Sequence, residues 1–213
     1  STGSRDRARE RLARPGVDVE PRQMWPTGMK TLGVPVTGRI PAGAAAETGR
    51  ALARANDLGW GTRLRTLLAD EAPDGPVPDD VIDATVQVLK SWSWSQRPVG
   101  VVTVASRRRP TLVASLGQRL ATIGRLPLLG EVQRTGGGSA GGNVANSARR
   151  LHQVWDAFAL PPDTAAAVAA AGGPVLAVDD RILSGWTMTV VARLLRQAGA
   201  PAVLPFALAL DAG

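Results

Sequence analysis

The residues with the clearest chemical use follow an apolar run near the C-terminus. Val175–Val178 lead directly into two adjacent acids, Asp179 and Asp180, and after three more residues the chain reads Ser184-Gly185-Trp186-Thr187. Two neighbouring carboxylates accept hydrogen bonds from a vicinal diol such as the hydroxyls of a ribose. Hydroxyl side chains and free backbone N–H groups at the start of a helix bind a phosphate. The spacing therefore predicts a site for a ribose 5-phosphate.

The elements around these residues predict how they are positioned. Apolar runs of strand length alternate with segments of helical periodicity in the second half of the chain. We expect strands at Val99–Val104, Leu126–Val132, Val175–Val178 and Ala202–Leu210, helices at Asp79–Trp92, Thr111–Ile123 and Trp186–Ala198, and a partly helical segment at Asn143–Trp155. This alternation predicts an α/β fold with a doubly wound parallel sheet, whose ligands bind at the carboxyl ends of the strands.

The first third of the chain differs in composition from the rest. Extended runs at Val17–Glu20 and Val34–Ile40, separated by turn residues, predict a small β module with Trp25 and Met24 in its core. A helix is expected over Glu47–Leu68, and a segment rich in Pro, Gly and Asp follows it. The expected organisation is a linker or the end of an upstream helix over residues 1–16, a β and helical module over 17–75, and an α/β domain over 76–213.

A second candidate anion site follows the first strand of the α/β domain. Ser106 precedes Arg107, Arg108 and Arg109, and guanidinium groups bind phosphates in a bidentate manner. These arginines would bind a pyrophosphate, bind DNA phosphates or remain solvated. The Gly-rich stretch Thr135–Asn143 is either a mobile catalytic loop or a plain linker.

Composition limits the classes of function. The 213 residues carry a formal net charge of +7, with 25 Lys and Arg residues of which only Lys30 and Lys90 are lysines. This favours a polyanionic partner, although Arg usage driven by a GC-rich coding sequence would give the same balance. With no Cys, a Cys-based zinc site is excluded, and the chain fits the cytoplasm. No apolar run is long enough to span a membrane, and no phosphate-binding ATPase motif is present.

Some side chains are expected to have structural roles. His152 is the only histidine and is expected on the surface or in packing rather than in catalysis. Trp92 and Trp94 alternate after a predicted helix and are expected in the core rather than against a ligand. No metal ligand and no catalytic residue is assigned.

The acidic motif resembles the PRPP-binding motif of type I phosphoribosyltransferases, and the runs VASRRRPTLVASLGQRLA and NSARRLHQVWDAFAL are similar to the ComF-like branch of that family. The resemblance implies PRPP with Mg²⁺ as ligand and cofactor. It implies a phosphoribosyl site at Asp179, Asp180, Leu183, Ser184, Gly185, Trp186 and Thr187, and a pyrophosphate loop at Ser106, Arg107 and Arg108. Two positions depart from the family pattern. Leu183 replaces an Asp that serves the base in many purine-using members, and Trp186 replaces a Gly, so its bulk is expected to narrow the phosphate loop.

A wider resemblance covers nearly all of the chain after about residue 17. EPRQMWPTGM, LGVPVTGRIPAG, ARANDLGWGTRLRTLL, RPVGVVTVASRRRPTLV and VDDRILSGWTMTVVARLLRQAGA resemble the C-terminal region of RecQ-like helicases of the RqlH type. This resemblance implies an ATP-dependent 3′–5′ DNA helicase of DNA repair whose motor domains, partners in cis, lie outside this chain.

Three functions are consistent with these patterns. The leading one is an accessory domain that binds DNA or a phosphorylated ribose compound for such a helicase. The second is an active phosphoribosyltransferase, and the third is a degenerate fold that serves protein contacts. For DNA, the expected contacts are Arg107, Arg108, Arg109, Arg149 and Arg150, together with the basic segment Arg5–Arg14.

Overall fold

The fold is built on one mixed sheet, with five parallel strands at its centre. The computed structural model describes residues 15–136 and 146–211. The strands are β1 (Val17–Val19), β2 (Gly49–Arg54), β3 (Gly100–Val104), β4 (Leu128–Arg134), β5 (Phe158–Ala159), β6 (Val175–Ile182) and β7 (Val203–Leu210). Their order is β1-β2-β7-β6-β3-β4-β5, and only β1 and β5, at the two edges, are antiparallel to their neighbours. The parallel strands therefore end at one common edge, which we name the carboxyl edge.

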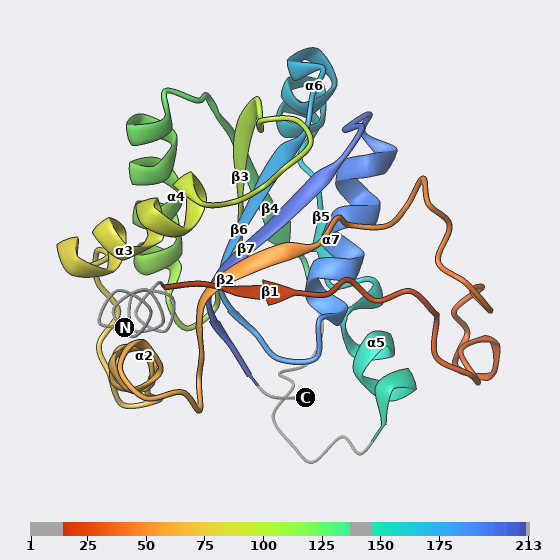
Figure 1. The fold of residues 1–213 in the computed structure, drawn as a ribbon. Coiled ribbons are helices and arrows are strands. Elements are labelled where there is room, and N and C mark those ends of the chain that lie inside the picture. The colour runs from red at the N-terminus through yellow and green to blue at the C-terminus, as the bar shows by residue number, and fades with distance from the viewer. Residues whose placement is uncertain (1–14, 137–145, 212–213) are drawn as a thin grey trace, which may run out of the picture.

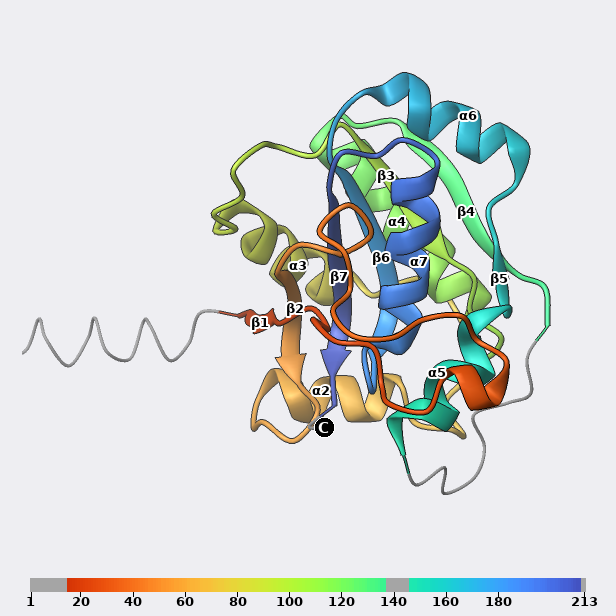
Figure 2. The same cartoon turned by 90° about the vertical axis from the view of Figure 1, so that its right-hand side faces the viewer.

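Helices cover both faces of this sheet (Figures 1 and 2). The described helices are the short 3-10 helix η1 (Lys30–Leu32), then α2 (Trp60–Leu67), α3 (Asp79–Lys90), α4 (Pro110–Gly124), α5 (Ser147–Trp155), α6 (Pro162–Ala171) and α7 (Trp186–Gln197). Helices α2, α3 and α4 lie on one side of the sheet, and α5 and α7 lie on the other. No helix in the ranges that the structure describes combines the length and apolarity needed to cross a membrane.

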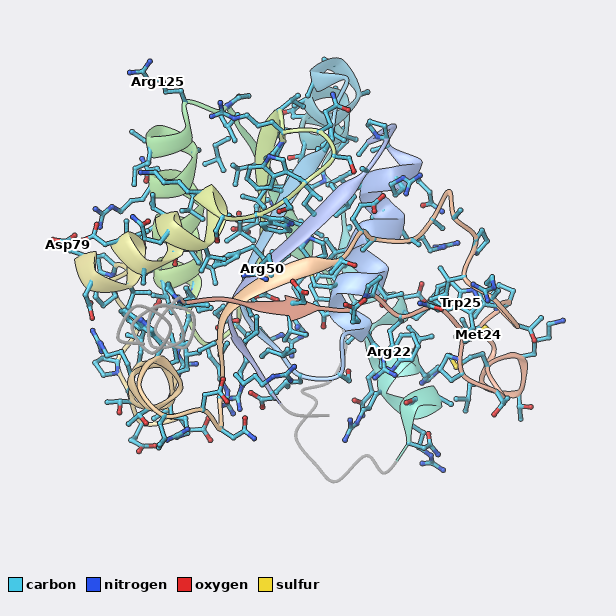
Figure 3. The ribbon with its side chains drawn as sticks, in the orientation of Figure 1. Arg22, Met24, Trp25, Arg50, Asp79 and Arg125 are labelled. Atoms are coloured by element: carbon cyan, nitrogen blue, oxygen red, sulfur yellow. The ribbon has the colours of Figure 1, made fainter. Side chains whose placement is uncertain are left out.

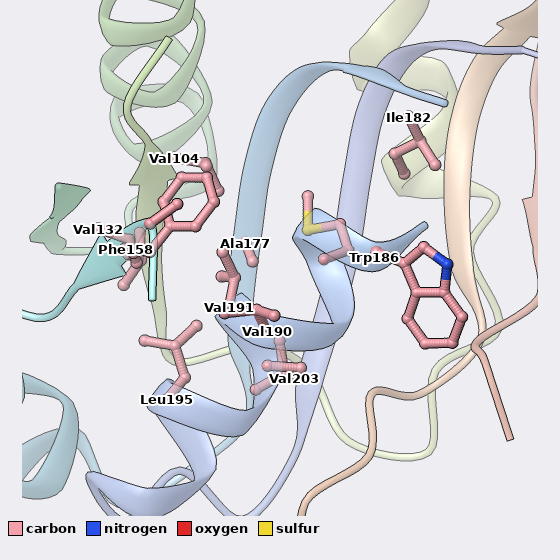
Figure 4. Packing of buried hydrophobic residues seen from close by; sticks show 14 of the residues in the cluster. Val104, Val132, Phe158, Ala177, Ile182, Trp186, Val190, Val191, Leu195 and Val203 are labelled. Carbon is pink, nitrogen blue, oxygen red and sulfur yellow. The ribbon is translucent and has the colours of Figure 1, made fainter. Parts of the chain in front are cut away.

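Alternating side chains of the central strands fill two core layers. On β3, Val102 joins the layer under α7 while Val101 joins the layer under α3 and α4. On β6, Ala177 and Leu176 divide between the same two layers, and Figure 4 shows part of the first layer. Both faces are covered, so β3, β7 and the first half of β6 are apolar at nearly every position, which is why they read as apolar runs in the sequence. The α/β fold and its four predicted central strands are confirmed.

The predicted helix over Glu47–Leu68 is wrong in its first half. Gly49–Arg54 is strand β2, paired in parallel with β7, and the helix begins only at Trp60. A Cβ on Gly49 would lie 2.5 Å from the Pro205 carbonyl oxygen, so the two backbones approach closely here. The alanines of this segment favour a helix locally, but pairing with β7 and burial override that preference.

The segment before β2 is largely irregular. Val34–Ile40 is not a strand and contributes only an isolated bridge between Met24 and Arg39. Trp25 is buried in the first core layer as expected, whereas Met24 is 52% exposed, contrary to the prediction (Figure 3). Strand β1 pairs with β2, and β2 pairs with β7. The segment 17–75 therefore contributes strands to the same sheet as the segment 76–213.

Candidate functional site

The predicted acids lie at the carboxyl edge, at the end of β6. Strands β3, β4 and β6 run in parallel, so the groups that end or follow them meet at this edge. Arg107 follows β3 and Arg134 is the last residue of β4. The positive charge of Arg107 and the negative charge of Asp179 both influence the pKa of Arg134, which shows that the three side chains share one neighbourhood. The sequence predicted Arg107 and Asp179 here but missed Arg134.

Asp179 is the buried member of the acidic pair. It is 7% exposed, and its Oδ1 accepts a hydrogen bond from the Asp180 backbone N–H at 2.8 Å. Burial raises the pKa of Asp179 well above its usual value, and the negative charge of Asp180 raises it further, while the positive charge of Arg134 acts in the opposite direction. Asp180 is half-buried and nearer to solvent. Burial therefore favours a proton on Asp179, and Asp180 is the member of the pair that is more accessible to a ligand.

Arg134 is a half-buried cation with an unsatisfied donor. Its guanidinium carbon lies 4.8 Å from the centre of the Phe158 ring, and its Nε is buried without a hydrogen-bond partner in the described part of the chain. Burial lowers the pKa of Arg134, and the nearby charge of Arg107 lowers it further. A buried N–H without a partner is costly. An anion bound between Arg107 and Arg134 would satisfy this donor and offset the repulsion.

The segment between β6 and α7 wraps the N-terminus of α7, as predicted. Gly185 has φ = 85°, in the left-handed region that favours glycine, and it precedes the first helical residue, Trp186. The Thr189 backbone N–H and hydroxyl both donate to the Gly185 carbonyl oxygen, at 3.0 and 2.8 Å. Ser184 and Thr187 are half-buried, and Leu183 is 54% exposed. The first turn of α7 thus lies at the same edge as the acidic pair.

Arg22, which the sequence did not single out, lies against this loop (Figure 3). Its Nε and Nη2 both donate to the Ser184 carbonyl oxygen, at 2.9 and 2.6 Å, and its guanidinium lies 4.6 Å from the centre of the Trp186 ring. Burial lowers the pKa of Arg22, and the positive charge of Arg150 lowers it further. A helix N-terminus repels cations, so two arginines beside it favour a bound anion. Arg22 precedes Ser184 by 162 residues, and no local spacing links them.

Trp186 is 2% exposed and belongs to the first core layer (Figure 4). The sequence predicted that its bulk would narrow the phosphate loop. Its burial beneath Arg22 instead indicates that the indole ring is taken up by the core, so the ring also supports the loop from below.

The arginines that follow β3 point in different directions. Arg107 donates from Nη2 to the Gly136 carbonyl oxygen at 3.2 Å, so it turns toward the end of β4. Arg108 is exposed and forms an ion pair with Asp70. Arg109 is 6% exposed: its Nη2 donates to the Ala69 carbonyl oxygen at 2.5 Å, and its backbone N–H donates to Ser106 Oγ at 3.0 Å. Arg107 is therefore the member of this run that lies near Arg134 at the end of β4.

Only some of the other predicted DNA contacts belong to the described residues. Arg149 and Arg150 are exposed in the first turn of α5, which Asn146 caps by accepting from the Arg149 backbone N–H at 2.9 Å. His152 is also exposed. The basic segment Arg5–Arg14 and most of the predicted Gly-rich loop, residues 137–143, lie outside the described residues.

The acidic pair is expected to bind a divalent ion only when a bound ligand supplies further oxygen atoms to that ion. Within residues 15–136 and 146–211 no group of three or more His, Asp or Glu residues is close enough to hold a metal. Mg²⁺ in phosphate sites is commonly bound by one or two carboxylates together with phosphate oxygens. Asp180 offers such a carboxylate, so the residues fit a Mg²⁺ that arrives with a diphosphate.

Comparisons with known proteins do not assign a function to this site, so it is interpreted from its own chemistry. No family model, no curated protein and no solved structure matches the chain. What the structure establishes is an α/β protein with a mixed seven-stranded sheet and an acidic pair surrounded by arginines at its carboxyl edge.

Proposed function

We propose that this chain is a phosphoribosyltransferase-like accessory domain of an ATP-dependent 3′–5′ DNA helicase of the RecQ-like kind acting in DNA repair, and that it binds a phosphorylated ribose compound at its carboxyl edge. The helicase part of the proposal rests on the sequence resemblance. The binding part rests on one observation: the buried acid Asp179 lies near the half-buried Arg134, and its strand leads into a helix N-terminus whose loop Arg22 contacts. The domain would work in the cytoplasm beside the helicase motor.

Each group in the site has a use toward such a ligand. Asp180 accepts hydrogen bonds from the ribose hydroxyls, and buried Asp179 orients it through the Asp180 backbone. The first amides of α7, with Arg22 beside them, bind the 5-phosphate. Arg107 and Arg134 bind a second anionic group, such as a pyrophosphate. If Mg²⁺ accompanies the ligand, it supplies positive charge that offsets the diphosphate.

The chain offers a matched pair of arginines to test this proposal. Arg107→Gln is expected to weaken PRPP binding about 10- to 150-fold, the effect of losing a charge-assisted hydrogen bond of about 1.5–3 kcal/mol. Arg108→Gln, which removes the same charge one residue later, is expected to change the affinity less than about twofold, because Arg108 pairs with Asp70. Calorimetric titration with PRPP and Mg²⁺ measures both. Equal losses in the two variants, or no heat with the unchanged protein, would contradict the proposal.

Turnover is a separate question from binding. A phosphoribosyltransferase must also place and activate a nucleobase, and Leu183, in the position where many purine-using relatives carry an Asp, is exposed and apolar. We therefore propose ligand binding without assigning a catalytic residue. Release of pyrophosphate from PRPP in the presence of purine or pyrimidine bases would instead support the active enzyme. A folded domain that binds neither PRPP nor DNA would support a role in protein contacts.

DNA binding is the second candidate function, favoured by exposed arginines near the same edge. Arg149 and Arg150 lie in the first turn of α5, and the charge of Arg150 influences Arg22, while Arg107 lies near Arg134. Arg109, which the sequence also predicted as a DNA contact, is buried and therefore does not belong to this surface. Such a surface binds DNA without sequence preference by releasing counterions.

The salt dependence of DNA affinity measures this surface. Fluorescence anisotropy with a labelled duplex gives the slope of the logarithm of the binding constant against the logarithm of the salt concentration. This slope is expected to become shallower by about 1.8 in the double variant Arg149→Gln/Arg150→Gln, since each phosphate contact contributes about 0.9. Arg125→Gln, near the opposite edge, is the control and should leave the slope unchanged. An unaltered slope in the double variant would remove α5 from any DNA interface.

A further inference from the structure

A cavity lies at the amino ends of the parallel strands, at the edge of the sheet opposite the acidic pair. It has a volume of about 560 Å³, within the range of small-molecule sites. Its lining includes Thr48, Pro174 and Ala202, which immediately precede β2, β6 and β7. The amino ends of three strands therefore form one side of it. The segment 91–96, which follows α3, forms the other.

Two tryptophans form the aromatic part of this lining. In the segment 91–96, Trp92 and Trp94 are half-buried, while Ser91, Ser93 and Ser95 are exposed. This alternation directs both indoles toward the body of the protein, where they pack against the second core layer. Their ring centres lie 5.3 Å apart with the planes inclined by 41°. The rings are thus held by the core and by each other, while both residues still line the cavity.

The polar groups around the rings are mostly neutral. Hydroxyl and amide side chains from Ser93, Ser95, Gln96 and Thr48 supply donors and acceptors. The charged lining residues are Asp18, Glu47 and Arg50, which sum to one negative charge. Arg50, on β2 (Figure 3), already donates to Asp18 Oδ1 at 2.7 Å, so its charge is matched by a carboxylate. The lining therefore disfavours a phosphate and suits a neutral ligand.

We propose that this cavity binds a nucleobase, stacked on the Trp92–Trp94 pair and hydrogen-bonded by the neutral side chains of the segment 91–96. A nucleobase is planar, uncharged and edged with both donors and acceptors, which matches each feature of the lining. The base reaches the cavity either as a free nucleoside or as an unpaired base of a single strand whose phosphates stay outside. This site is separate from the carboxyl edge and does not depend on the function proposed there.

Calorimetric titration with adenosine, AMP and a short oligodeoxyadenylate tests the proposal and separates the two sources. Adenosine is expected to bind, and AMP to bind more weakly, because its phosphate meets the net negative lining. Glu47→Gln, at an exposed position of the lining, is expected to bring the affinity for AMP closer to that for adenosine. Tighter binding of the oligonucleotide than of adenosine assigns the cavity to single strands, and the reverse assigns it to nucleosides.

Trp94→Leu is expected to weaken adenosine binding about 5- to 150-fold, the effect of removing one stacking ring. The control is Leu58→Ala, a change at a 90% exposed side chain near the carboxyl edge, which should leave binding unchanged. Should Trp94→Leu fail to fold, Gln96→Ala at an exposed position removes a hydrogen-bonding group without touching the core, and a several-fold loss is expected.

Three outcomes would overturn the proposal. The first is the absence of heat with adenosine and with the oligonucleotide at millimolar ligand. The second is binding heat with a disaccharide such as maltose but not with adenosine, which would indicate that the tryptophans stack against a sugar. The third is an equal loss of affinity in Leu58→Ala and Trp94→Leu.

Discussion

Asp179→Asn is expected to stabilise the domain at neutral pH, although it changes a buried residue of the candidate site. Asn has the shape of Asp, and its side-chain oxygen can still accept from the Asp180 backbone N–H. Asn carries no ionisable group, so the free-energy cost of burying an acid beside Asp180, either as a carboxylate or with a bound proton, disappears. Folding lowers the acid dissociation constant of Asp179. For every tenfold decrease in this constant, the variant is expected to gain about 1.4 kcal/mol in its free energy of unfolding. Chemical denaturation at pH 7.5 measures it.

The raised pKa of Asp179 also predicts how the stability difference between the unchanged protein and Asp179→Asn depends on pH. The pKa of Asp179 is raised in the folded state, so the folded protein binds more protons than the unfolded chain between pH 3.9, the ordinary value for Asp, and the raised value. Stability of the unchanged protein therefore increases relative to Asp179→Asn as the pH falls through this window, and the difference levels off below it. Asp83→Asn, at an exposed position of α3, controls for the loss of one acid. An Asp179→Asn variant less stable than the unchanged protein at pH 7.5 would contradict the assignment of the proton.

The two acids are expected to differ in ligand binding as well. Asp180→Asn changes the more exposed acid and should weaken PRPP binding about 10- to 150-fold. Asp179→Asn changes the buried acid, on which burial favours a proton, and should have a smaller effect. The motif alone treats the acids as equivalent, and only burial distinguishes them.

The central part of the fold was predictable because its signals are local. The strands β3, β4, β6 and β7 are short apolar runs between turn residues, and α4 and α7 carry apolar residues at helical spacing. The site at the end of β6 was predictable for the same reason, since strand, acids, loop and helix follow one another in the chain.

The remaining parts depend on contacts between distant segments. Strand β2 is rich in alanine, and only its pairing with β7, about 150 residues later, makes it a strand. Arg22 reaches the loop at Ser184 from an irregular segment, so neither charge nor spacing marks it. Arg134 is the last residue of β4 but lies two residues beyond the predicted strand Leu126–Val132, so the prediction placed it outside the strand. What the sequence missed is therefore tertiary placement rather than residue type.

Trp186→Ala is expected to produce the largest loss of stability, about 3–5 kcal/mol, because it removes a fully buried indole from the first core layer. Trp186→Phe should cost less than half of this, since the ring is retained and the buried Nε1, which has no hydrogen-bond partner in the described residues, is eliminated. The matched control is Trp60→Ala at the start of α2, where the side chain is half-buried and the expected cost is smaller. Denaturant unfolding of the three variants measures these differences.

The stability data also test whether Trp186 and Arg22 act together on the loop between β6 and α7. The guanidinium of Arg22 lies over the Trp186 ring and donates twice to the Ser184 carbonyl oxygen, so it connects the core to the loop backbone. A double-mutant cycle of Arg22→Leu with Trp186→Ala is expected to give a coupling of about 0.5–2 kcal/mol. A cost below about 1 kcal/mol for Trp186→Ala would mean that the indole lies outside the core. Coupling near zero would mean that Arg22 is held by the Ser184 carbonyl alone, and the loop would then keep its position without the ring beneath it.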